Sequence, residues 1–382
     1  MVKTMIERPF PSSLLLQSHE TKTNYFKGIT IPHRRLREAL NLLLINVLEP
    51  ADTLIFLVFG VTGVGKTTLR LRLEKMLLSE FLPSLRSNPG QIAVAGIEAI
   101  PAERGKFSYK DYYTRALEAL QEVLIEYKID YRLPSDESQE WGWPNQTYYK
   151  DSPALRRAME KVFRYRQLKA FTIDEAQHLL MMAGAHQMLQ QMNWIKSIAN
   201  LTGTVHILFG TYELLNCPTV NGQMGRRSED IHLSPYQASS EEDVAEFIRI
   251  IRTFQRHLPL EQEPKLAQHY EYLFDGSVGC VGILKNWLTR SLRVAYAEEA
   301  RTLKLKHLKM GALGASRLKT IKEEAEQGLR RFLSESSFFE QPYSREHRPK
   351  RVPINYLPPK SKGRVGQRKP KRDAVGMNPD GS

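Results

Sequence analysis

The sequence predicts an α/β fold in which a parallel five-stranded sheet is flanked by helices and followed by a small all-α domain. Short apolar runs occur at long intervals, as expected of strands that are buried on both faces of a parallel sheet. The intervals between them have room for helices, and residues 240–332 have helical periodicity. The runs are "LIFLVFG" (54–60), "QIAVAGI" (91–97), "KAFTIDE" (169–175) and "TVHILFG" (204–210), with "IHL" (231–233) as a shorter fifth candidate.

These signals divide the chain into four parts. Residues 1–30 are expected to be an irregular lead-in, and residues 31–239 the α/β domain, which opens with an amphipathic helix. Within that domain, residues 130–153 are rich in Pro, Ser, Asn and aromatic residues and are expected to be an inserted loop. Residues 240–332 are expected to form an α-helical lid, and residues 341–382 a basic disordered tail.

Composition indicates a soluble chain with a substantial core, since 41% of its 382 residues are hydrophobic. The formal net charge is +13, and the tail from residue 341 contributes +8 of it, from 11 Lys/Arg against 3 Asp/Glu. Two cysteines do not make a disulfide framework, and no apolar run approaches the roughly 20 residues of a membrane span. We therefore expect a cytoplasmic protein, with a polyanion among its candidate partners.

The stretch "GVTGVGKT" after the first apolar run matches G-x-x-x-x-G-K-[ST], the phosphate loop of nucleotide-binding proteins. Its glycines let backbone N–H groups point at phosphate oxygens, Lys66 can reach the β- and γ-phosphates, and Thr67 can ligate Mg²⁺. A strand before it and a helix after it are the context that this motif requires. The alternative is a chance glycine-rich turn. The expected ATP contacts are Gly60, Val61, Thr62, Gly63, Val64, Gly65, Lys66, Thr67 and Thr68.

Two acids and a threonine follow later apolar runs. Asp174 could hold Mg²⁺ while Glu175 polarises the water that attacks the γ-phosphate; the alternative is an acidic helix N-terminus. Thr211 ends the fourth run and could bind that water or the γ-phosphate, although it could also be a simple cap. Together these residues predict an ATPase that uses Mg²⁺.

Three cations extend the expected site. Arg226 and Arg227 lie between the last two candidate strands, where guanidinium groups could reach a neighbouring subunit's nucleotide; a solvated basic turn is the alternative. Lys285 lies in the first turns of a helix after a glycine-rich turn, and could sense the γ-phosphate from the lid or simply belong to a helix start.

This set of features resembles the AAA+ ATPases, with "GVTGVGKTT", "TIDEAQHL", "LFGTYELL", "GQMGRRS" and the helical lid as the matching parts. Within that superfamily it is most similar to transposition regulators of the TnsC and TniB type, relatives of the phage protein MuB. The resemblance covers roughly residues 30–290. Two positions depart from the pattern: Lys285 stands where an arginine is frequent, and Ser228 where an aromatic residue is common.

The resemblance implies a DNA-associated prokaryotic ATPase that assembles on double-stranded DNA as a ring or helical filament. Such regulators link a target-selection protein, in some cases a CRISPR effector, to the transposase, and slow ATP hydrolysis would act as the disassembly switch. It also implies sequence-nonspecific contacts to the DNA backbone from the loop after the second strand; a solvated charged loop is the alternative. The candidate contacts are Arg104, Lys106, Ser108 and Lys110.

Other functions remain open at this point. A helicase loader or replication initiator would use the same nucleotide motifs, but the sequence has no clear winged-helix domain between residues 303 and 332. A small-molecule kinase would have no need of adjacent water-activating acids. ATP could also serve as structural glue with almost no hydrolysis.

Overall fold

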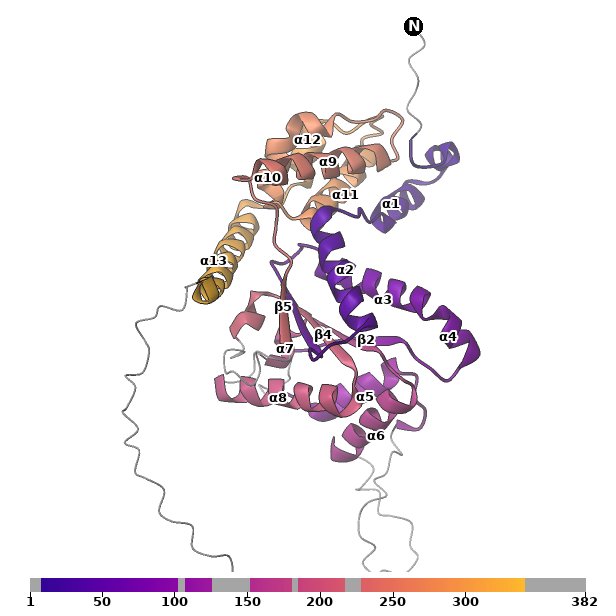
Figure 1. Ribbon diagram of the computed structural model, residues 1–382. Helices are drawn as coiled ribbons and strands as arrows, with labels where there is room; N and C mark the ends of the chain where they lie inside the picture. The colour runs from indigo at the N-terminus through magenta and orange to yellow at the C-terminus, as the bar shows by residue number, and fades with distance from the viewer. Residues whose placement is uncertain (1–7, 102–106, 126–151, 181–184, 217–227, 341–382) are drawn as a thin grey trace, which may run out of the picture. The chain divides into compact units, whose positions relative to one another are not determined.

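The computed structural model describes residues 8–101, 107–125, 152–180, 185–216 and 228–340 (Figure 1). Its five strands are β1 (Ile55–Phe59), β2 (Val94–Glu98), β3 (Ala170–Asp174), β4 (Val205–Gly210) and β5 (Ser228–His232). They form one parallel sheet in the order β2-β3-β4-β1-β5. Every residue of β1, β3 and β4 is buried, which explains why these strands stand out as apolar runs. The expected parallel five-stranded sheet is confirmed.

Helices flank the sheet on both faces. Figure 1 shows α2 (Arg34–Leu48) and α3 (Lys66–Glu80) on one side, and α5 (Tyr109–Ala119), α6 (Ser152–Tyr165) and α8 (Ala185–Thr202) on the other. The α2 helix buries Leu36, Leu40, Leu43 and Val47, the positions whose helical spacing predicted it. Short helices α4 (Leu82–Ser87), α7 (Gln177–Leu180) and η5 (Tyr212–Asn216) follow α3, β3 and β4.

The C-terminal part is helical, as expected. It comprises α9 (Glu241–His257), η6 (Leu266–His269), α10 (Tyr270–Ser277), α11 (Val281–Ala297), α12 (Leu305–Gly311) and α13 (Ala315–Glu340). Helices α9 to α12 enclose a second hydrophobic cluster around Phe254, Leu284 and Trp287. Helix α13 contributes elsewhere, because Ile321 and Ala325 belong to the cluster of the sheet. None of the described helices is long and apolar enough to cross a membrane.

The expectation of an irregular lead-in over residues 1–30 is wrong. The described part of it holds η1 (Ser12–Leu16) and the α-helix α1 (His19–Gly28). Ser18 caps α1, with its Oγ accepting a hydrogen bond from the Thr21 N–H at 3.2 Å. Phe26 is fully buried in the cluster of α9 to α12, 5.9 Å from Phe254 between ring centroids. The stability of helix α1 therefore depends on tertiary contacts with the cluster of α9 to α12. The few apolar positions of α1 did not predict these contacts.

Phe26→Ala should lower the free energy of unfolding by about 3–5 kcal/mol, because it empties a fully buried aromatic site. Urea denaturation followed by circular dichroism measures the change. Leu16→Ala is the matched control from the same segment, since Leu16 is 91% exposed. Equal stability of both variants would show that the N-terminal segment does not contribute to the core of the helical part.

Candidate nucleotide-binding site

The phosphate loop connects β1 to α3, as the motif predicted. Gly63 and Gly65 have φ angles of +80° and +122°, in the left-handed region that favours glycine. Helix α3 begins directly at Lys66, so the free N–H groups of its first turn lie beside the loop. A Cβ on Gly63 would lie 2.7 Å from Ile283 Cγ1, which shows that α11 packs directly against this loop.

Lys66 is held inside the loop. Its side chain is 7% exposed, and Nζ donates hydrogen bonds to the carbonyl oxygens of Gly60 (2.8 Å) and Val61 (3.2 Å). Burial lowers the pKa of Lys66, and the nearby carboxylates of Glu175, Glu324 and Asp174 act in the opposite direction. An ammonium in this concave loop is placed to bind phosphate oxygens. Thr67, the expected Mg²⁺ ligand, follows it on α3 and is exposed.

Asp174 lies at the carboxyl end of β3 and is 4% exposed. Its Oδ1 accepts a hydrogen bond from the Glu175 N–H at 3.0 Å, and its Oδ2 is 3.2 Å from Nε of Arg70 on α3. Arg70 was not among the expected site residues. It could have been predicted from its position one helical turn after Lys66, because residues i and i+4 share a helix face. Arg70 compensates the charge of this buried carboxylate, so a bound Mg²⁺ would share Asp174 with a guanidinium.

Glu175 and Thr211 are brought together at the same edge of the sheet. Glu175 has a φ of +51°, and its Oε2 accepts a hydrogen bond from Nε2 of Gln177 at 2.5 Å. The Oε1 of Gln177 accepts a hydrogen bond from the Thr211 N–H at 3.2 Å. The Thr211 hydroxyl donates to Oε2 of Glu213 at 3.1 Å. Gln177 was not among the expected site residues, although it lies two positions after Glu175.

A small cavity of about 40 Å³ lies between the phosphate loop, the N-terminal segment and α11. Lys285 lines it, but its Nζ donates a hydrogen bond to the Lys27 carbonyl oxygen at 2.6 Å, and burial lowers its pKa. Thr68, an expected nucleotide contact, lines the same cavity. Residues 29–31, which also line this cavity, were not among the expected site residues. The cavity lining is Ile29, Thr30, Ile31, His33, Leu36, Val64, Gly65, Thr68, Phe254, Val281, Gly282 and Lys285.

Glu324 on α13 also contacts the phosphate loop. Its Oε1 accepts hydrogen bonds from the Thr62 N–H at 3.2 Å and the Thr62 hydroxyl at 3.4 Å. This contact could not be predicted from the sequence, since 262 residues separate Thr62 and Glu324. A carboxylate at this place adds negative charge beside a loop that is otherwise suited to anions.

Several expected site residues lie outside the described residues, namely Arg104, Lys106, Arg226 and Arg227. Ser108 and Lys110 are described at the start of α5. The Ser108 Oγ accepts a hydrogen bond from the Asp111 N–H at 3.2 Å, so this hydroxyl caps the helix, and Lys110 is exposed. These two residues are not among those that line the cavity beside the phosphate loop.

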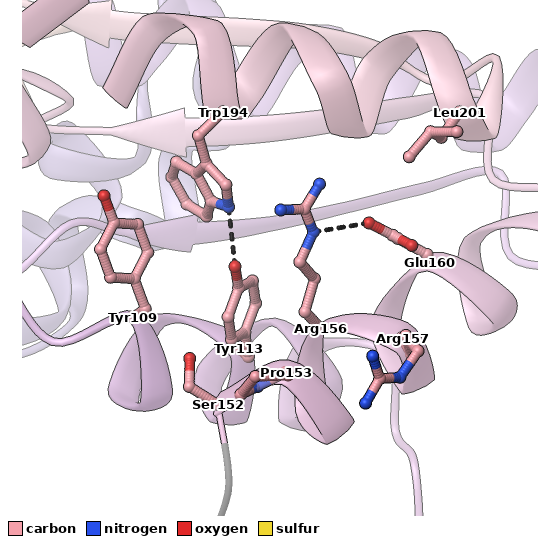
Figure 2. A pocket seen from close by; sticks show the side chains of 9 residues that line it. All are labelled: Tyr109, Tyr113, Ser152, Pro153, Arg156, Arg157, Glu160, Trp194 and Leu201. Atoms are coloured by element: carbon pink, nitrogen blue, oxygen red, sulfur yellow. Dashed lines mark hydrogen bonds and ion pairs between the residues drawn. The ribbon is translucent and has the colours of Figure 1, made fainter. Parts of the chain in front are cut away.

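Aromatic side chains fix α5 to α8 (Figure 2). Trp194 Nε1 donates a hydrogen bond to the Tyr113 hydroxyl at 2.7 Å, and Tyr109 stands edge-on to Trp194 at 5.1 Å between centroids. The three rings line a second cavity of about 470 Å³, distinct from the one at the phosphate loop. Arg156 lies across it and donates from Nε to Oε1 of Glu160 at 2.7 Å. These ring contacts therefore attach the exposed start of α5 to α8.

Comparison with known proteins agrees with this geometry. Residues 51–217 match the family model described as "AAA domain". This match covers β1 to η5 and includes the phosphate loop, Asp174, Glu175 and Thr211. A search of curated proteins found no significant match.

Solved structures of similar fold include three archaeal proteins. The ADP form of the ORC2 protein of Aeropyrum pernix is 14% identical, with 75% of this chain and 71% of that chain covered and a TM-score of 0.48. Cdc6p of Pyrobaculum aerophilum is 16% identical, with 75% and 69% covered and a TM-score of 0.47. The Walker-type ATPase of Pyrococcus abyssi is 16% identical, with 83% and 80% covered and a TM-score of 0.42. Likenesses at this level assign no activity.

Glu324→Gln should tighten the binding of ADP and ATP by about 2- to 5-fold at low salt, because it removes a partly exposed negative charge beside the phosphate loop. Titration calorimetry at low and high salt measures the change, which should shrink as salt screens the charge. Glu326→Gln is the matched control, since Glu326 lies on the same helix and is exposed. Weaker nucleotide binding by Glu324→Gln would show instead that this carboxylate supports the loop.

Proposed function

We propose that the chain is an ATPase whose nucleotide site consists of the phosphate loop and the carboxyl ends of β3 and β4. One observation carries this proposal: Lys66, the adjacent pair Asp174–Glu175, and Thr211 follow three parallel strands whose carboxyl ends lie at one edge of the sheet, within the residues that match the AAA domain model. The residues fit an ATP–Mg²⁺ complex, because the loop has two glycines in the left-handed region and a buried ammonium inside it. Bound Mg²⁺ would supply charge neutralisation at the phosphates.

In this proposal each side chain has one task. Lys66 binds the β- and γ-phosphates and stabilises the negative charge that develops during transfer. Thr67 and Asp174 would hold Mg²⁺, directly or through water. Glu175 accepts a proton from the attacking water, and Thr211 orients that water or the γ-phosphate. Lys285 lies at the cavity beside Gly65 and Thr68, where it would contact the nucleotide from the lid side after releasing Lys27.

We further propose that ATP binding drives this chain to assemble on double-stranded DNA as a regulator of transposition, with hydrolysis as the disassembly switch. Support comes from the resemblance to regulators of the TnsC and TniB type and from the net charge of +13. Arg226 and Arg227 would complete a neighbouring subunit's site. Exposed Lys110, with Arg104, Lys106 and Ser108, would contact the DNA backbone, and a transposase and a target-selection protein would be the further partners.

Lys66→Ala and Glu175→Gln should each lower kcat for ATP hydrolysis by about 100-fold or more, because they remove transition-state charge stabilisation and the general base. Steady-state release of phosphate measures this. Lys75→Ala is the matched control, since Lys75 is an exposed lysine on the same helix and should keep wild-type activity. A phosphorylated acceptor accumulating in place of free phosphate would point to a kinase.

With ATP and duplex DNA, the wild-type protein should form rings or filaments visible by electron microscopy. Lys66→Ala should abolish them, whereas Glu175→Gln should lengthen their lifetime, because bound ATP persists in that variant. The Lys75→Ala protein should assemble as the wild type does. Discrete monomers under these conditions would contradict the assembly proposal. The ATPase proposal is tested separately, by the hydrolysis assay.

A further inference from the structure

The side-chain amide of Gln177 joins the two loops that carry Glu175 and Thr211. Gln177 is the first residue of α7 and is 4% exposed. Its Nε2 donates to Oε2 of Glu175 at 2.5 Å, and its Oε1 accepts from the backbone N–H of Thr211 at 3.2 Å. Both polar groups of the amide are therefore used, and each is bonded to a different strand end.

The orientation of this amide follows from its partners. The Thr211 N–H is a donor, so only the carbonyl oxygen of Gln177 can face it, and the NH₂ group must then face the Glu175 carboxylate. A Cβ on Gly210 would lie 2.6 Å from the Gln177 Oε1, so glycine is needed there for the amide to approach β4. The Ala176 N–H also donates to the Phe209 carbonyl oxygen at 2.8 Å, which holds the two strand ends together.

The backbone conformation of Glu175 depends on contacts such as the hydrogen bond from Gln177. Its φ of +51° is unusual for a non-glycine residue, and such conformations persist only where surrounding contacts fix them. The charge-assisted bond from Gln177 is the one hydrogen bond to the Glu175 carboxylate among those found in the described part of the chain. A movement of the Thr211 backbone at the end of β4 would be transmitted to the Glu175 carboxylate through one buried side chain, that of Gln177.

We propose that Gln177 is a positioning residue that couples the water-activating carboxylate of Glu175 to the end of β4 at Thr211. This rests on the proposed function, since it assumes that Glu175 activates water. Gln177 acts through Glu175 and does not itself contact the nucleotide. Its loss should therefore affect turnover and spare nucleotide binding.

The test compares Gln177→Leu and Gln177→Glu with the wild type. Leucine removes both hydrogen bonds at similar size, whereas glutamate keeps an acceptor for Thr211 but removes the donor and places a second carboxylate beside Glu175. Both variants should lower kcat about 10- to 100-fold, with KM for ATP and Kd for ADP within about 3-fold of the wild type. Wild-type kcat in either variant overturns the inference. Loss of ADP binding by both overturns it too, since Gln177 would then be a structural residue.

Gln255→Leu is the matched control. The Gln255 amide has the same pattern of bonds within the helical part, donating to Oε1 of Glu263 at 2.7 Å and accepting from the Ala267 N–H at 3.3 Å. This variant should keep wild-type kcat. If it lowers kcat as much as Gln177→Leu does, the effect is a general cost of losing an amide bridge between two segments, and the inference fails.

A double mutant separates this inference from the proposed function. In a Glu175→Gln background, Gln177→Leu should cause less than about a 2-fold further change in single-turnover hydrolysis, because residues that act as a unit are not additive. A full additional 10-fold loss overturns the coupling through Glu175. If Glu175→Gln alone keeps wild-type activity, both the proposed base and this inference fail. If it abolishes activity and Gln177→Leu does not, this inference alone fails.

Discussion

The parallel register of β1, β4 and β3 is the constraint on which the rest of the site depends. Phe59 pairs with Gly210, and Ile173 with Leu208, so the carboxyl ends of the three strands lie at one edge. The phosphate loop, the acidic pair and Thr211 each begin where one of these strands ends. Three segments far apart in the chain therefore meet because their strands are parallel and adjacent, and a shift of one residue in either pairing would separate them.

Close packing of the helical part against the phosphate loop is the second constraint. A Cβ on Gly282 would lie 2.4 Å from the carbonyl oxygen of Gly63, so α11 and the loop can approach only because both positions are glycine. The N-terminal segment completes this side, with Ile29 and Ile31 lining the cavity beside Gly65. The phosphate loop therefore lies beside both α11 and the N-terminal segment.

Much of this architecture follows from local signals. The apolar runs predicted β1, β3 and β4 because every residue of these strands is buried. Strands β2 and β5 are only partly buried, and each shares only part of its residues with the run that predicted it. The spacing of apolar residues predicted α2, because the residues on the buried face of a helix recur every three or four positions; here they are Leu36, Leu40, Leu43 and Val47. Helix α1 was not predicted because its one deeply buried aromatic residue, Phe26, packs against residues more than 200 positions away in the chain. Most of helix α13 falls within residues 240–332, which were expected to form the lid, but Ile321 and Ala325 pack with the sheet.

The candidate site residues could be predicted from the sequence: the loop from Gly60 to Thr67, the acids Asp174 and Glu175, and Thr211 at the end of β4. Such motifs are readable because backbone geometry and strand position are encoded within a few neighbouring residues. Their partners could be identified only in the folded chain, namely Arg70 on Asp174, Gln177 between Glu175 and Thr211, and Glu324 on Thr62. Hydrogen bonds and ion pairs between distant segments depend on how the elements pack, and a polar side chain on a helix does not show in the sequence which partner it meets.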